Sequence, residues 1–181
     1  MRLVLFSTLL IFLTGCSVIG PSEDDLGKRS TGTVMNDNRT KSLAIKNIRK
    51  AHPELEEAHL NVTSFNGVVL LTGQVPSQEA AEVAARVAGQ VRNVRRVHNE
   101  LAIAGPTSMI ARSNDMWLGT KIKTQMRFSD ETEANRIKVV TENGVVYLMG
   151  LLTRDEAERA VALTREVFGV QKIVTVFEYI N

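Results

Sequence analysis

The sequence predicts an α+β fold made of two tandem αββαβ units, each with two helices packed on a small three-stranded mixed sheet. The first observation is an internal repeat, because residues 66–73 align with residues 143–150 at an offset of about 77 positions. The second is an Asn-Gly pair between two apolar runs in each copy. The third is that apolar residues recur at strand spacing and at helical spacing in the same order in both copies.

Each unit is expected to begin with a helix, over residues 40–51 and 114–128. A short strand follows, in which alternate residues share one face. These residues are Leu60, Val62 and Ser64 in the first unit and Ile137, Val139 and Thr141 in the second.

The Asn-Gly pairs at residues 66–67 and 143–144 predict two-residue hairpin turns, because both residue types tolerate a positive φ angle. The second strand of each hairpin is expected over residues 68–72 and 145–149.

A second helix is expected after Ser77 and after Thr153, since either side chain can cap a helix that has acidic residues in its first turn. Its apolar residues follow the i, i+3, i+4, i+7 spacing of one helical face. They are Ala80, Val83, Ala84, Val87 and Val91 in the first unit and Ala157, Ala160, Val161, Thr164 and Val167 in the second. Asn93 and Gly169 stand where a left-handed residue is favoured at the helix exit. The final strand of each unit carries Val97, Leu101 and Ile103, or Ile173, Phe177 and Tyr179.

The N-terminus has the pattern of a bacterial lipoprotein signal. Met1 and Arg2 precede an apolar stretch over residues 3–13, which is too short to span a bilayer. Cys16, the only cysteine of the chain, follows the small residue Gly15. This matches the lipobox, in which the thiol is acylated and the chain is cut in front of it. Cys16 is therefore the predicted lipid attachment site.

The predicted organisation has five parts. Residues 17–38 are rich in Ser, Gly, Asp, Asn and Thr and have no helical or strand period, which favours a flexible tether. The parts are a lipoprotein signal peptide at 1–15, a lipidated flexible tether at 16–38, a first domain at 39–104, a linker at 105–112 and a second domain at 113–181.

Three motifs of the repeat resemble the BON domain family. They are the Gly-Val-Val-x-Leu-x-Gly core, the Glu-Ala pair of the second helix and the closing Gly-Val-x-x-Ile at residues 169–173. Two such units behind a lipobox are similar to dual-BON outer-membrane lipoproteins. The resemblance implies BON-like αββαβ domains, a lipid anchor in the inner leaflet of the outer membrane, a periplasm-facing location and a role in envelope integrity. Ser17 follows Cys16 in place of the Asp that tends to mark inner-membrane retention in lipoprotein families, which also implies the outer membrane.

The first helix of the second unit is the predicted contact with anionic phospholipid. Its stripe of Leu118, Ile122 and Met126 is expected to face the sheet. Another face gathers two aromatic residues and a lysine, a combination that suits the headgroup region of an anionic membrane. The resemblance implies that Trp117, Leu118, Thr120, Lys121 and Thr124 bind the lipid, and helical geometry adds Phe128.

Two alternatives stay open. Trp117, the only tryptophan, could instead pack against the neighbouring unit. The chain could also be a protein-interaction module that docks on outer-membrane protein-assembly machinery or on another envelope component.

The sequence does not predict an enzyme, a metal site or a cofactor. His52, His59 and His98 are scattered, and none has a metal-type partner at i+3 or i+4. There is no nucleophile motif and no phosphate-binding glycine loop. A formal net charge of +2 argues against a nucleic-acid partner.

Overall fold

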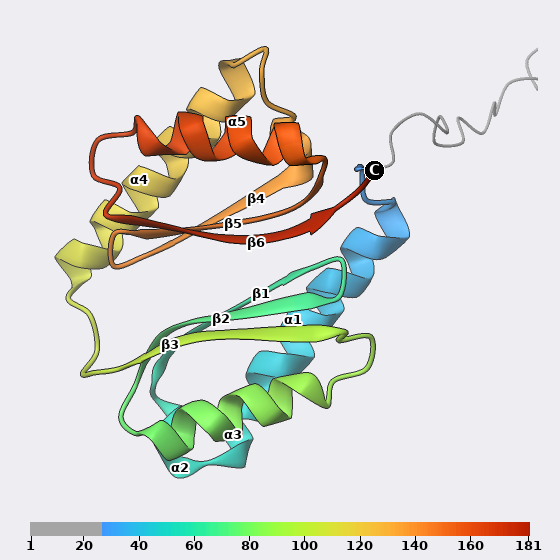
Figure 1. Cartoon of the computed structure of the whole chain (residues 1–181). Coiled ribbons are helices and arrows are strands. Elements are labelled where there is room, and N and C mark those ends of the chain that lie inside the picture. Colours follow the sequence, from blue (N-terminus) through green and yellow to red (C-terminus); the bar gives the residue numbers. More distant parts are fainter. Residues whose placement is uncertain (1–26) are drawn as a thin grey trace, which may run out of the picture.

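Two consecutive αββαβ units stack on one another through their sheets (Figure 1). The computed structural model describes residues 27–181, so Cys16, the predicted signal peptide and residues 16–26 of the predicted tether lie outside the described residues. The first unit consists of α1 (Thr31–Ala51), α2 (Pro53–Glu56), β1 (His59–Phe65), β2 (Val68–Val75), α3 (Gln78–Gly89) and β3 (Arg96–Ile103). The second consists of α4 (Met109–Phe128), the 3-10 helix η1 (Ala134–Arg136), β4 (Ile137–Glu142), β5 (Val145–Leu152), α5 (Arg154–Arg165) and β6 (Lys172–Tyr179).

Both sheets are mixed, which confirms the predicted fold class. The strand orders are β1-β2-β3 and β4-β5-β6. In each sheet the hairpin pair is antiparallel, and the third strand lies parallel to the central one. The parallel pairing follows from the helix that connects the second and third strands of each unit.

The first helix of each unit begins earlier than its sequence predicts. Helix α1 begins at Thr31 and α4 at Met109, where Ser30 and Ser108 cap the free backbone N–H groups of the first turn. The prediction that residues 31–38 belong to a flexible tether is therefore wrong. These first turns extend past the apolar core, and even Met109 and Ile110 at the start of α4 are exposed, so the turns carry little of the helical period.

A buried aspartate of the first helix holds the hairpin turn in each unit. Asp37 accepts hydrogen bonds from the backbone N–H groups of Asn66 and Gly67 at 2.8 and 3.1 Å. Asp115 accepts the matching bonds from Asn143 and Gly144 at 2.7 and 2.9 Å. Both turns have positive φ angles at both residues, as the Asn-Gly pairs predict.

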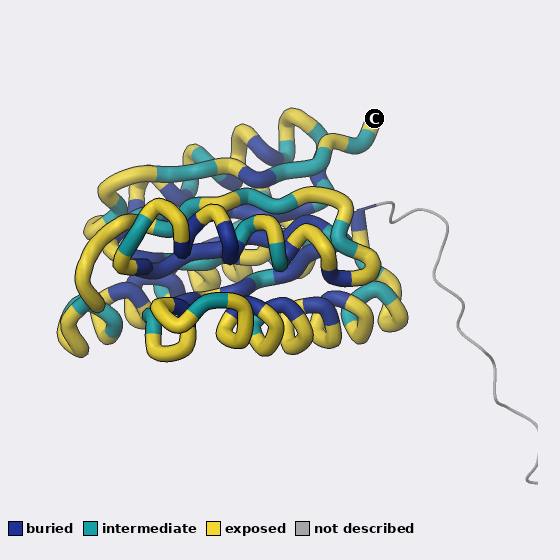
Figure 2. The backbone as a smooth tube through the Cα atoms, turned by 90° about the horizontal axis from the view of Figure 1, so that it is seen from below, coloured by how far each residue is buried: buried dark blue, intermediate teal, exposed yellow. Residues whose placement is uncertain are grey.

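Each unit has its own core between its helices and one face of its sheet. Figure 2 shows buried positions concentrated along the strands, while the helices expose their outer turns. In the first core, Ala44 and Ile48 of α1 meet Val69 and Leu71 of β2. The second core is built in the same way, from residues of α4, β5 and α5.

A third core joins the two sheets face to face. Its buried members are Phe65, Val68, Leu70, Tyr147, Met149 and Val176. Glu142 at the end of β4 bonds Gln74 near the end of β2, while Glu178 near the end of β6 bonds Asn66 before the start of β2. The central strands β2 and β5 therefore run in opposite directions across the interface.

Candidate functional site

Helix α4 is fixed on the second unit by its inward face. Leu118, Ile122 and Met126 are buried against the sheet, as the predicted stripe requires. Gly119 lies so close to β4 that an added Cβ would stand 2.9 Å from the Thr141 hydroxyl oxygen. Together with the Asp115 bonds to the hairpin turn, this packing sets which face of α4 points outward.

The outward face carries the predicted aromatic residues. Trp117 and Phe128 are 60% and 83% exposed, and the Lys121 ammonium lies 5.1 Å from the centre of the Trp117 ring. Thr120 and Thr124 are also exposed. At a rise of about 1.5 Å per residue, Phe128 lies roughly 16 Å farther along the helix than Trp117.

Leu118 does not share this face. Its side chain is only 4% exposed and packs in the core of the second unit. Leu118 borders the cavity that Trp117 lines, but its side chain is too deeply buried to insert into a membrane as the exposed Trp117 ring can. The alternative that Trp117 packs against the first unit is also wrong, because the cavity that it lines belongs to the second unit.

Phe168 is a surface residue that the sequence analysis missed. It lies between α5 and β6, is 85% exposed, and lines the same cavity of about 470 Å³ as Trp117. The Asn143–Gly144 turn lines the same cavity. Phe168 has no helical or strand period around it, so only its place in the fold brings it next to Trp117. We call Trp117, Lys121, Phe128 and Phe168 the aromatic surface.

The first unit has no counterpart of this surface. Asp37 and Asp115 match in the two units, which aligns Trp117 with Arg39. Asn93 and Gly169 match at the helix exits, which aligns Phe168 with Arg92. The two copies thus share a fold and differ where the second exposes aromatic rings.

The flank of α4 is electropositive. Burial, and after it the charges of Lys123, Lys41 and Arg29, lower the pKa of Lys138 on β4. These cations come from α1, α4, β4 and the segment before α1, so both units contribute to a positive potential around Lys138. Such a potential attracts anionic headgroups.

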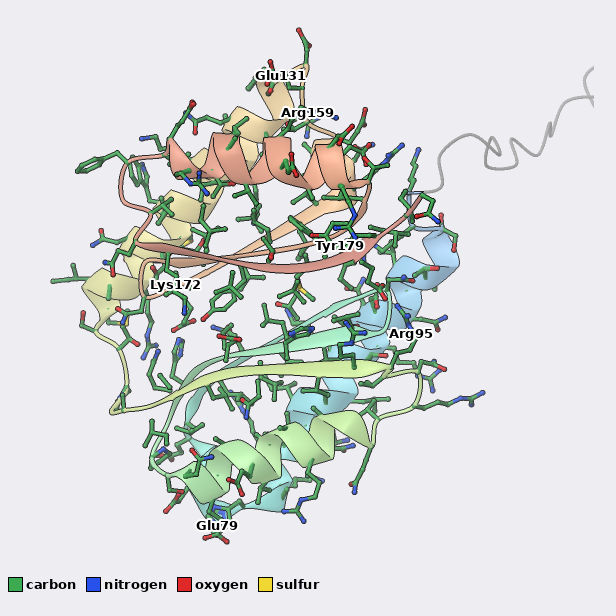
Figure 3. The ribbon with its side chains drawn as sticks, in the orientation of Figure 1. Glu79, Arg95, Glu131, Arg159, Lys172 and Tyr179 are labelled. Carbon is green, nitrogen blue, oxygen red and sulfur yellow. The ribbon has the colours of Figure 1, made fainter. Side chains whose placement is uncertain are left out.

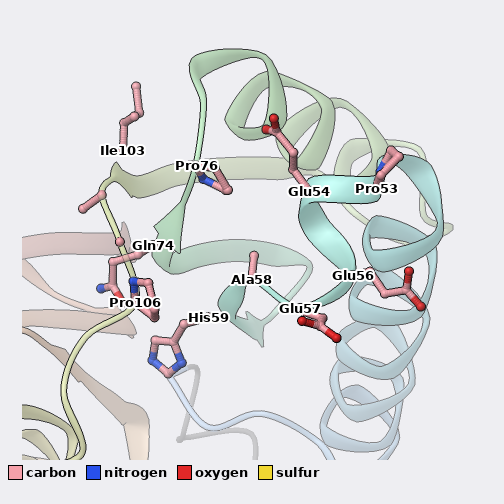
Figure 4. Close-up of a pocket in the computed structure, with 12 residues that line it drawn as sticks. Pro53, Glu54, Glu56, Glu57, Ala58, His59, Gln74, Pro76, Ile103 and Pro106 are labelled. Carbon is pink, nitrogen blue, oxygen red and sulfur yellow. The ribbon is translucent and has the colours of Figure 1, made fainter.

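A larger cavity, of about 750 Å³, lies in the first unit beside the linker (Figure 4). Glu54, Glu56 and Glu57 line it together with His59. Three carboxylates repel a lipid phosphate, so this cavity is a poorer candidate for an anionic ligand than the aromatic surface.

Residues 27–181 were also searched for membrane-spanning helices and metal sites. None of their helices has the length and apolar character needed to cross a bilayer. No group of three or more His, Cys, Asp or Glu side chains is arranged among them to hold a metal ion.

The BON domain family model matches residues 36–105 and again residues 114–181. The chain belongs to the BON domain family. Among its relatives, "Outer membrane lipoprotein DolP" of Haemophilus influenzae is 33% identical over 187 residues, which cover 99% of this chain and 96% of the relative. The "21 kDa hemolysin" of Actinobacillus pleuropneumoniae is 36% identical over 84% of this chain and 79% of its own length. "Osmotically-inducible protein Y" of Escherichia coli is 28% identical over 82% of this chain and 75% of its own length.

Proposed function

We propose that this BON protein is an outer-membrane lipoprotein, acylated on Cys16 and facing the periplasm, that binds anionic phospholipid through the aromatic surface of its second unit. The exposed pair of Trp117 and Phe168 beside the Lys121 cation carries the proposal. Aromatic rings are suited to the headgroup level, and cations beside them meet lipid phosphates. The name of the Haemophilus influenzae relative supports the location, and the Cys16 motif supports the anchor.

The anchor and the aromatic surface would have separate roles. Multiple acyl chains are sufficient for stable attachment, so the aromatic surface need not recruit the protein. A tethered surface meets lipid at high effective concentration, so weak contacts are enough to select where the protein resides in the leaflet. Support for envelope integrity would follow from that placement.

A vesicle-binding assay tests the lipid assignment. A soluble Cys16→Ser chain without the signal peptide is expected to bind phosphatidylcholine vesicles only when phosphatidylglycerol is included, and added salt is expected to weaken the binding. Trp117→Ala and Phe168→Ala should each reduce binding. Met35→Ala, which removes an exposed apolar side chain from α1 of the first unit without changing the net charge, is the control and should leave binding unchanged.

Equal binding by the wild type and by both aromatic variants would reject the aromatic surface as the lipid site. Loss of a copurifying protein partner on the same substitutions, without any vesicle binding by the wild type, would favour the protein-interaction module instead.

A further inference from the structure

Strand β6 has one unpaired edge. Within residues 27–181 it pairs with β5 alone. The N–H of Ile180 donates to the Leu152 carbonyl, so even-numbered residues of this segment direct their backbone groups toward β5. Ile173, Thr175, Phe177 and Tyr179 must then direct their N–H and C=O groups toward the free edge.

On the matching edge of the first unit, a side chain occupies one outward N–H group. The same alternation, set by the bond from Ala104 N–H to the Val75 carbonyl, directs the N–H of Leu101 outward on β3. Asn99 accepts a hydrogen bond from that N–H with its own Oδ1 at 3.3 Å. Its Nδ2 also donates to the Ala81 carbonyl on α3 at 3.1 Å, which holds the side chain in place.

Strand β6 has lost this protection. Thr175 stands at the position of Asn99, and its side chain is too short to hold the N–H of Phe177 in the same way. Val174 and Val176 of β6, which stand where β3 has His98 and Glu100, pack in the core between the two sheets and do not face the free edge. A side chain that occupies the backbone of an edge strand hinders its pairing with another chain, so the outward N–H of Phe177 on β6 is open where that of Leu101 on β3 is occupied.

A groove runs beside the open edge, between β6 and α5. It has a volume of about 310 Å³, and Thr175, Phe177 and Tyr179 line its strand side. Arg154 and Arg165 line its helix side, with the Arg154 guanidinium 4.9 Å from the centre of the Tyr179 ring. Lys172 and Tyr179 mark the two ends of the strand in Figure 3.

We infer that the free edge of β6 binds an extended segment of a partner protein, which adds a fourth strand to the second sheet. The open N–H and C=O groups supply the main-chain hydrogen bonds of strand addition, and the groove receives alternate side chains of the partner. Arg154 and Arg165 outnumber Glu158, the one carboxylate in the groove lining, so the groove carries a net positive charge and the preferred segment alternates apolar and acidic residues. This surface is separate from the aromatic surface, so partner binding and lipid binding would be independent.

Amide hydrogen exchange tests the inference. It is measured on the full mature chain with the Cys16→Ser substitution. The probe is an eight-residue blocked peptide of alternating valine and glutamate. Its addition is expected to protect the backbone N–H groups of residues 173, 175, 177 and 179 at least tenfold, while residues 97, 99, 101 and 103 of β3 keep their exchange rates.

Two substitutions at one position probe the edge itself. Thr175→Pro removes an outward N–H without removing a bond to β5, so it should weaken peptide binding at least tenfold. Thr175→Asn copies the closed edge of β3 and should weaken binding as well, which keeps the test valid if the proline variant fails to fold. Ile103→Pro, at an outward position on β3, is the control and should bind the peptide like the wild type.

Two results would overturn the inference. One is an absence of protection on β6, or protection that neither Thr175 variant alters. The other is protection of the same residues that rises with protein concentration in the absence of peptide and coincides with a dimer in sedimentation, because the edge would then pair with a second copy of this chain.

Discussion

Gln74 donates a hydrogen bond from Nε2 to Oε1 of Glu142 over 2.9 Å, and this buried pair links the two units at one end of their shared interface. The other Glu142 oxygen accepts a bond from Asn61 Nδ2 at 3.1 Å. One carboxylate of the second unit therefore satisfies two amide donors of the first.

Replacing that carboxylate should destabilise the whole protein. Glu142→Leu leaves the buried amide donor of Gln74 unpaired at the interface, so the free energy of unfolding should fall by about 2 kcal/mol. Urea unfolding measures the change. Glu133→Leu makes the same replacement at an exposed position and should change stability by less than about 0.5 kcal/mol. A Glu142 variant as stable as the wild type would show that the polar contact does not hold the units together.

Acid should weaken the turn that Asp37 holds. Burial alone would raise the pKa of Asp37, but hydrogen bonds from Asn66, Gly67, Ser64 and Arg29 outweigh it and leave the pKa below its ordinary value. Because the folded pKa is lower than the unfolded one, the stabilisation is complete above about pH 4 and is lost as the pH falls through the folded pKa. Asp37→Asn should be less stable at pH 7 and show a smaller loss of stability on acidification. An unchanged acid dependence would contradict this role.

Alkali should act on the interface between the sheets. Burial, and after it the charges of Glu100 and Glu142, raise the pKa of Tyr147 to about 12. A raised pKa means that the neutral phenol is favoured by folding, so the stabilisation is complete below about pH 10 and is lost as the pH rises toward 12. The ultraviolet absorbance of tyrosinate follows the ionisation, and Tyr147→Phe should remove this part of the alkaline destabilisation. Ionisation of Tyr147 near pH 10 without unfolding would contradict it.

The elements that repeat in the sequence could be predicted, and the contacts between the repeats could not. The Asn-Gly turns and the stripe of Leu118, Ile122 and Met126 follow from local pattern, and both are found. The stacking of the sheets depends on residues distant in sequence. Its one local signal is the uninterrupted apolar run at the start of β2, which is typical of a strand buried on both faces.

The candidate surface was predictable only in part. Trp117 and Phe128 follow from helical spacing, which also places Leu118 toward the sheet, where it is buried. Only the family resemblance adds Leu118 to the predicted lipid-binding residues. Phe168 lies in a connection without any period, so nothing local relates it to Trp117. The repeated Asn-Asp pair at residues 36–37 and 114–115 was the available signal for the early start of both first helices.

Gly73 should be one of the least replaceable residues of the first sheet. Its φ angle is +117°, and an added Cβ would stand 1.9 Å from the carbonyl oxygen of His59 on β1. Gly73→Ala should therefore cost about 3 kcal/mol or more of stability, because the backbone of one strand must move. Gly105, whose added Cβ would meet no atom within 4 Å, provides the control: Gly105→Ala should be nearly neutral in the same denaturation experiment. A neutral Gly73→Ala would mean that β1 and β2 are not registered as described.

Adjacent residues of α4 should separate folding from binding. Leu118→Ala removes a buried side chain and should lower the free energy of unfolding by about 2–5 kcal/mol, whereas Trp117→Ala removes an exposed ring and should change it by less than about 0.5 kcal/mol. In vesicle binding, Trp117→Ala should have the larger effect of the two substitutions, because the folded fraction of Leu118→Ala keeps its aromatic surface intact. Measured at a temperature where both variants are folded, Leu118→Ala should bind like the wild type and Trp117→Ala should not. A large loss of stability in Trp117→Ala would place the ring in a packing role and remove the main support for the lipid site.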